Sequence, residues 1–102
     1  MFNITTLGLT VLALMTPSQI CEESGIFAEH LQRYRQYGIT LTYNPRSLYN
    51  ATGNRDVNAE YVAAIVKFAL SQPVQPTRQL KNMAISRARY QVEALCYKTL
   101  RG

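Results

Sequence analysis

Two cysteines place the strongest constraint on how this chain can fold. Cys21 and Cys96 are its only cysteines, and one stands near each end of the charged part of the chain. They form no CxxC pair of the kind that holds zinc or performs redox chemistry. In an oxidising compartment we expect them to pair and to close most of the chain into one ring. Loop-closure entropy gives a ring of that size about 4 kcal/mol of stabilisation.

The N-terminal segment indicates how the chain reaches such a compartment. The first twenty residues contain no charged side chain, and the apolar run Leu7–Met15 has the length of a signal-peptide core. A membrane-spanning helix needs about 20 apolar residues, so this run is too short to span. We predict a signal peptide over residues 1–18, a helical domain over residues 19–102, and a location in the periplasm or outside the cell.

The residues after the apolar run suit removal of the segment. Pro17 is expected to end the signal helix, and the small residues Thr16 and Ser18 favour cleavage before Gln19. The segment lacks the usual basic residue at its start, so two alternatives stay open. It is either a core helix of a cytosolic domain, or an uncleaved segment through which the protein contacts a membrane.

Helix signals divide the rest of the chain into three helices and one long loop. The helices are expected at Glu22–Tyr37, from an Asp56 or Asn58 cap to Ser71, and from a Thr77 cap to Leu100. Gly38 favours the end of the first helix, and Pro73 cannot continue the second. The loop over residues 39–56 contains turn signals and leaves room for one helical turn near residues 46–50.

Apolar periodicity assigns a buried face to each helix. On the first helix the face is Cys21, Ser24, Phe27, Ala28, Leu31 and Tyr34, with Gln32 and Gln36 on the opposite, exposed side. The second helix is apolar around most of its circumference, so we expect it to be the central helix. On the third helix the face is Leu80, Ala84, Ile85, Ala88, Val92 and Leu95, with Cys96 at its edge. The prediction is an all-α, three-helix domain closed by the disulfide and preceded by the signal helix.

No constellation in the sequence indicates catalysis or a bound cofactor. His30 is the only histidine, and no Ser or Cys accompanies it at a spacing that suggests a nucleophile and its base. The six acidic residues are spread over several segments, without a metal-ligand spacing, and the chain has no glycine-rich phosphate loop. We predict a protein that is not an enzyme and has no catalytic, metal or cofactor site.

The excess of positive charge suits an anionic partner without selecting one. Eleven basic and six acidic residues give a net charge of +5, which also keeps a small domain soluble. On the third helix the basic residues fall into two groups on nearly opposite sides: Arg78, Lys81 and Arg89, and Arg87, Lys98 and Arg101. A surface that follows phosphates keeps its cations together. We therefore predict no nucleic-acid binding.

A second apolar stripe on the third helix is the candidate for binding. Met83, Tyr90 and Tyr97 recur every seven residues outside the core face, with Arg87 and Arg101 alongside. Tyr, Met and Arg are enriched at protein interfaces, so the stripe predicts a protein partner in the periplasm or extracellular space. The competing expectation, which the apolar content of the long loop favours, is that this loop folds over the stripe and buries it.

Three stretches carry a resemblance to known proteins. They follow Cys21 at the start of an amphipathic helix and read RYRQYGITL (33–41), EYVAAIVKFALSQP (60–73) and ALCYKTLRG (94–102). The chain resembles small exported helical proteins of Gram-negative bacteria and their phages, most of which have no assigned function. It is similar in plan to phage antiholins of the RI type. The resemblance implies a periplasmic protein that binds another macromolecule or, if residues 1–18 stay attached, a membrane-proximal component that is structural or regulates lysis.

Overall fold

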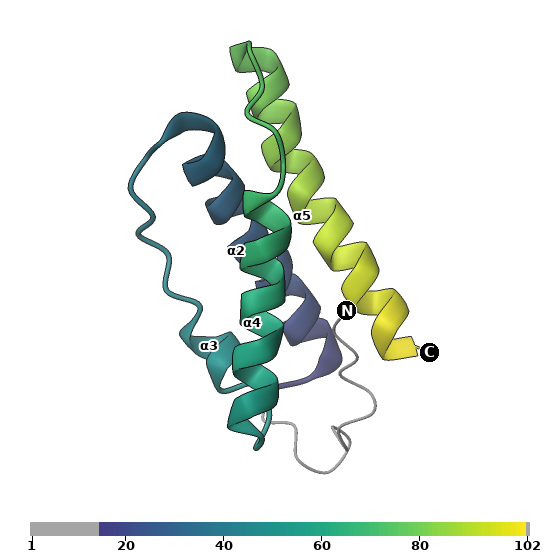
Figure 1. The fold of residues 1–102 in the computed structure, drawn as a ribbon. Helices are drawn as coiled ribbons and strands as arrows, with labels where there is room; N and C mark the ends of the chain where they lie inside the picture. The colour runs from purple at the N-terminus through teal and green to yellow at the C-terminus, as the bar shows by residue number, and fades with distance from the viewer. Residues whose placement is uncertain (1–14, 102) are drawn as a thin grey trace.

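The computed structural model describes residues 15–101, which form four helices (Figure 1). In chain order these are α2 (Pro17–Tyr37), α3 (Arg46–Tyr49), α4 (Arg55–Leu70) and α5 (Arg78–Arg101). The described part is all-helical, as predicted, and α3 is the helical turn expected within the long loop. The predicted signal peptide, apart from its last four residues, lies outside the described residues.

The central helix α2 begins earlier than Glu22, where we expected it to start. The hydroxyl of Thr16 accepts a hydrogen bond from the backbone N of Gln19 at 3.1 Å, and the Gln19 side chain accepts one from the Thr16 backbone at 2.9 Å. This reciprocal capping box fixes the start of the helix. Pro17 is the first residue of α2, a position that suits proline because it needs no N–H group. The predicted cleavage point before Gln19 therefore lies inside the first turn of α2. The expected signal helix before Pro17 lies outside the described residues.

α3, α4 and α5 all pack on α2, which makes α2 the central helix (Figure 1). α4 runs parallel to α2 in a constant register. Three hydrogen bonds join residues that are 37 positions apart in the sequence: Ser24 and Tyr61, Gln32 and Ala69, Gln36 and Pro73. α5 runs antiparallel to both. The prediction that the second helix is central was wrong, because part of the apolar circumference of α4 is not covered by any other helix.

Two buried glutamines allow α2 to be covered on several sides. Gln32 donates to the carbonyl of Ala69 at 3.1 Å, and Gln36 donates to the carbonyl of Pro73 at 2.8 Å. The Gln36 side-chain oxygen accepts from the backbone N of Gln75 at 2.8 Å. The last carbonyls of a helix have no partner within it, so these amides satisfy the end of α4 and the turn after it. The prediction that Gln32 and Gln36 face water was wrong for this reason.

The disulfide pair joins the start of α2 to the last third of α5. Cys21 and Cys96 are fully buried, their Cα atoms are 5.4 Å apart, and their sulfur atoms are at disulfide distance. This confirms the predicted pair. It also turns Cys96 from the edge to the middle of the buried face of α5. Leu80 and Leu95, which we expected in the core, are consequently rotated outwards and exposed.

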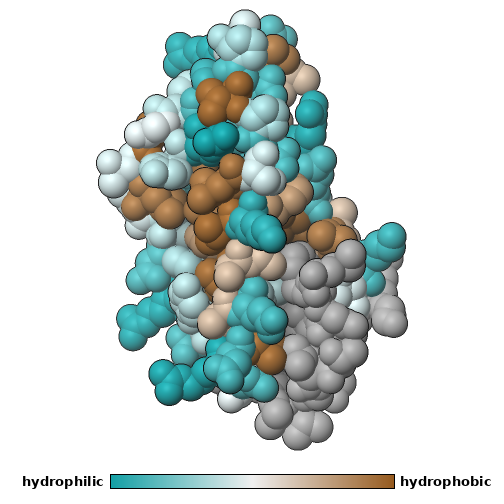
Figure 2. Space-filling view, viewed as in Figure 1, coloured by the Kyte–Doolittle hydropathy of each residue, from teal (hydrophilic) through white to brown (hydrophobic). Residues whose placement is uncertain are grey.

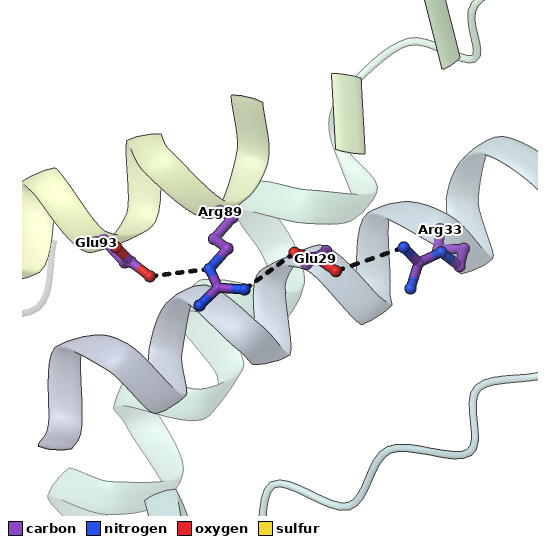
Figure 3. A network of polar contacts seen from close by, with 4 residues as sticks. All are labelled: Glu29, Arg33, Arg89 and Glu93. Atoms are coloured by element: carbon purple, nitrogen blue, oxygen red, sulfur yellow. Dashed lines mark hydrogen bonds and ion pairs between the residues drawn. The ribbon is translucent and has the colours of Figure 1, made fainter. Parts of the chain in front are cut away.

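Ion pairs align α5 along α2 (Figure 3). Arg89 on α5 lies 3.4 Å from Glu29 on α2 and 3.1 Å from Glu93 one turn along its own helix. Each pair is partly exposed and contributes less than about 1 kcal/mol. Gly25 on α2 lets Glu93 approach closely, since a Cβ atom at Gly25 would lie 2.4 Å from the Glu93 Cγ.

Candidate functional site

The predicted binding stripe lies on the side of α5 that faces away from α2. Met83, Tyr90 and Tyr97 are exposed, and Tyr90, at 69%, is the most exposed large apolar side chain of the described residues. Arg87 lies with Met83 and Tyr90 around a shallow depression on this helix. We call Met83, Arg87, Tyr90 and Tyr97 the α5 face. Arg101 ends α5, and its side chain lies outside what the structure describes.

The long loop does not cover the α5 face, so that expectation was wrong. Tyr43 holds the loop against α2 instead: its hydroxyl donates to Glu23 at 2.6 Å, and its ring stacks on His30 and Phe27. Burial and the Glu23 carboxylate raise the pKa of Tyr43, which keeps the phenol a neutral donor. Leu48 in α3 is fully buried. Tyr43 and Leu48 therefore join the core, whereas Ile39, Leu41 and Tyr49 stay exposed on the loop.

Some cations of α5 make polar contacts within the chain, and others make no ion pair. Lys81 donates to the carbonyl of Gln36 at 2.8 Å, and Arg89 is held by two carboxylates. Arg87 and Lys98 make no ion pair within residues 15–99. Of these two cations, Arg87 lies beside Met83 and Tyr90.

A groove that we did not predict adjoins the α5 face. α4 and α5 both pack on α2 but hardly on each other, and an open apolar groove of about 740 Å³ lies between them. Its lining from α4 is Ala64, Ile65, Lys67, Phe68 and Ser71. Its lining from α5 is Gln91, Val92, Ala94, Leu95 and Lys98. In Figure 2 hydrophobic residues gather in the middle of the face that α4 and α5 present. We call this feature the α4–α5 groove.

The groove is continuous with the α5 face, and one feature of the sequence indicates it. Gln91 lines both the groove and the depression around Tyr90, so the two features form one surface. The excess of apolar residues on α4, which we interpreted as the mark of a central helix, was the signal. Ala64 and Phe68 belong to that excess and are only half-buried.

The titratable groups away from this surface serve the fold. His30 stacks on the Tyr43 ring with 4.8 Å between centroids. The Tyr61 hydroxyl hydrogen-bonds to Ser24 and donates to the sulfur of Cys96 at 3.4 Å. Burial raises the pKa of Tyr61 to about 12, and the hydrogen bond to Ser24 opposes that rise. Within the described part of the chain, no three His, Cys, Asp or Glu residues form a group that could hold a metal ion.

Comparison with protein-family models, with curated proteins and with solved structures finds no match for this chain. The resemblance to small exported helical proteins and to antiholins therefore stays a prediction from the sequence. Among residues 15–101, no helix has the length and the apolar character needed to cross a membrane.

Proposed function

We propose that this chain is an exported, non-enzymatic domain that binds another protein through the α5 face. The observation that supports this most is the exposure of Met83, Tyr90 and Tyr97 on a helix whose opposite side supplies the core. A partner that covers these side chains removes a large apolar area from water. A few such anchors usually supply most of the affinity of an interface.

The composition of the surface favours a protein over a nucleic acid. Arg87 lies beside Met83 and Tyr90, and Arg, Met and Tyr are enriched at protein interfaces. The remaining cations of α5 do not form a single basic stripe, because Arg89 and Lys81 are directed to α2. A phosphate backbone would require several cations on one side.

The cysteine pair supports export. Disulfides persist in oxidising compartments and are rare in the cytosol, and Cys21 and Cys96 lie at disulfide distance in the core. The uncharged apolar run Leu7–Met15 is the expected core of a signal peptide. Together they favour a periplasmic or secreted protein.

One observation favours the second candidate, a membrane-proximal component that keeps residues 1–18, as an antiholin-like structural or lysis-regulating protein would. Thr16 caps α2, and Met15 packs against the core cluster. Cleavage before Gln19 would remove both, and the loss of a cap alone costs about 1 kcal/mol. The intact mass of the protein isolated from its own compartment decides between the two: it includes the first eighteen residues only in the second case.

The double variant Tyr90→Ala, Tyr97→Ala tests whether the α5 face is free for a partner. Because both rings are exposed, we expect the free energy of unfolding in urea to change by less than about 1 kcal/mol. Tyr49→Ala, at an exposed position in α3, is the matched control. A loss of several kcal/mol in the double variant would show that the rings are covered, and would refute the proposal.

A photo-crosslinking side chain at position 90, compared with one at position 49, then tests binding in intact cells. We expect one discrete adduct from position 90 that is lost in an Arg87→Glu background, and none from position 49. Equal labelling at the two positions, or no adduct at either, contradicts the proposed function.

A further inference from the structure

The α4–α5 groove has the pattern of a site for one more helix. Apart from one core residue on each helix, α4 lines it with residues 64, 67, 68 and 71, and α5 lines it with residues 91, 94, 95 and 98. On both helices these are positions i, i+3, i+4 and i+7, which form a single stripe along one side of a helix. An amphipathic helix binds by placing its apolar face in a hydrophobic groove, and two such stripes form a groove of this kind.

The dimensions of the groove also fit a helix. Each stripe runs from position i to position i+7, which is about 10 Å at 1.5 Å per residue. The floor consists of Ile65 and Val92, and the walls include Phe68 and Leu95. A helix with about two turns in the groove, at about 5.4 Å per turn, would pack on α4 and α5 as they pack on α2.

The charge of the groove selects the occupant. Lys67 lies on the α4 side and Lys98 on the α5 side, and neither makes an ion pair within the described residues. The lining contains no acidic residue. A second copy of this chain, with its net charge of +5, is disfavoured by repulsion. The N-terminal residues 1–14 carry no charge that would pair with the lysines.

We propose that the α4–α5 groove binds an amphipathic helix of a partner protein whose apolar face is flanked by Asp or Glu residues on both sides. This inference rests on the proposed function and deepens it, because it names the form and charge of the partner. The apolar face covers Phe68 and Leu95, and the acidic flanks meet Lys67 and Lys98.

The test uses the full chain and two labelled peptides of about 18 residues, long enough to form a helix. Both carry leucines on one face; one has glutamates on its flanks and the other has lysines. In fluorescence anisotropy at low salt we expect the glutamate peptide to bind about tenfold more tightly than the lysine peptide. The double variant Lys67→Glu, Lys98→Glu should reverse this preference while leaving the apolar floor intact.

Two leucines of nearly equal exposure give the control. Leu95 is 36% exposed and lines the groove, whereas Leu70 is 38% exposed and does not. Leu95→Asp should weaken binding of the glutamate peptide at least tenfold, and Leu70→Asp should leave it unchanged, with circular dichroism verifying that both variants fold.

Several results would overturn the inference: equal binding of the two peptides, no binding of either, or the same loss in both leucine variants. A concentration-dependent rise in molecular mass that Leu95→Asp abolishes would also overturn it, because a second copy would then occupy the groove. Failure here is separable from failure of the proposed function. If the crosslink at position 90 persists in the Leu95→Asp variant, the α5 face binds a protein and only the groove inference is lost.

Discussion

Removal of the disulfide tests the arrangement of the helices most directly. Cys21 and Cys96 join the start of the central helix to the end of α5, with a sequence separation of 75. Loop-closure entropy gives about 3 kcal/mol for a 15-residue ring and about 4.7 kcal/mol for a 100-residue ring, so this ring is worth about 4.5 kcal/mol. Measured values scatter, and we expect the variant Cys21→Ala, Cys96→Ala to lose about 2–5 kcal/mol of unfolding free energy.

The assay is urea unfolding followed by circular dichroism. A domain of this size has a urea slope of about 1–3 kcal/mol per molar, so the midpoint should fall by on the order of 2 M. Alanine is the replacement of choice because both positions are fully buried and a serine hydroxyl would add a cost of its own. A midpoint within about 0.5 M of the wild type, or wild-type thiols that alkylate without reductant, would refute the reasoning.

Four further substitutions probe the packing. Gly25→Ala should cost about 1–3 kcal/mol in urea melts, because the new methyl group collides with Glu93; an unchanged stability would mean that Glu93 moves aside freely. Ile65→Ala should cost about 2–5 kcal/mol and Lys67→Ala less than about 1, so equal losses would contradict the orientation of α4. Since the pKa of Tyr61 is about 12 when folded and 10.0 in its unperturbed state, its neutral form stabilises the fold fully below pH 10, and that contribution is lost between about pH 10 and 12. Tyr61→Phe should flatten this alkaline dependence, and an equally steep profile would show that other groups cause it.

The cysteine pair, the end of α2 and the start of α5 were predictable from local signals. Gly38 adopts φ 67° after α2, and the hydroxyl of Thr77 accepts from the backbone N of Leu80 at the start of α5, as helix-end chemistry predicts. The cap of α4 is Asn54 rather than Asp56 or Asn58, a shift of the kind that neighbouring capping residues allow.

The identity of the central helix was not predictable from apolar content. Periodicity places Gln32 in water, whereas its amide meets the carbonyl of Ala69, a residue 37 positions away whose location depends on the whole fold. The groove was not predictable for the same reason, since periodicity does not report contacts between residues far apart in the sequence. Apolar residues on α4 indicate that something covers them, but the sequence does not say whether the cover belongs to this chain or to another molecule.

The place of α2 in the fold has a consequence for the timing of folding. A chain leaves the ribosome or a translocation channel from its N-terminus, so α2 emerges first. Its buried glutamines and Cys21 find their partners only at residues 69–75 and 96. We therefore expect α2 to wait, exposed and marginally stable, until almost the entire chain has emerged. Such a chain closes only when Cys96, near the end of α5, has emerged.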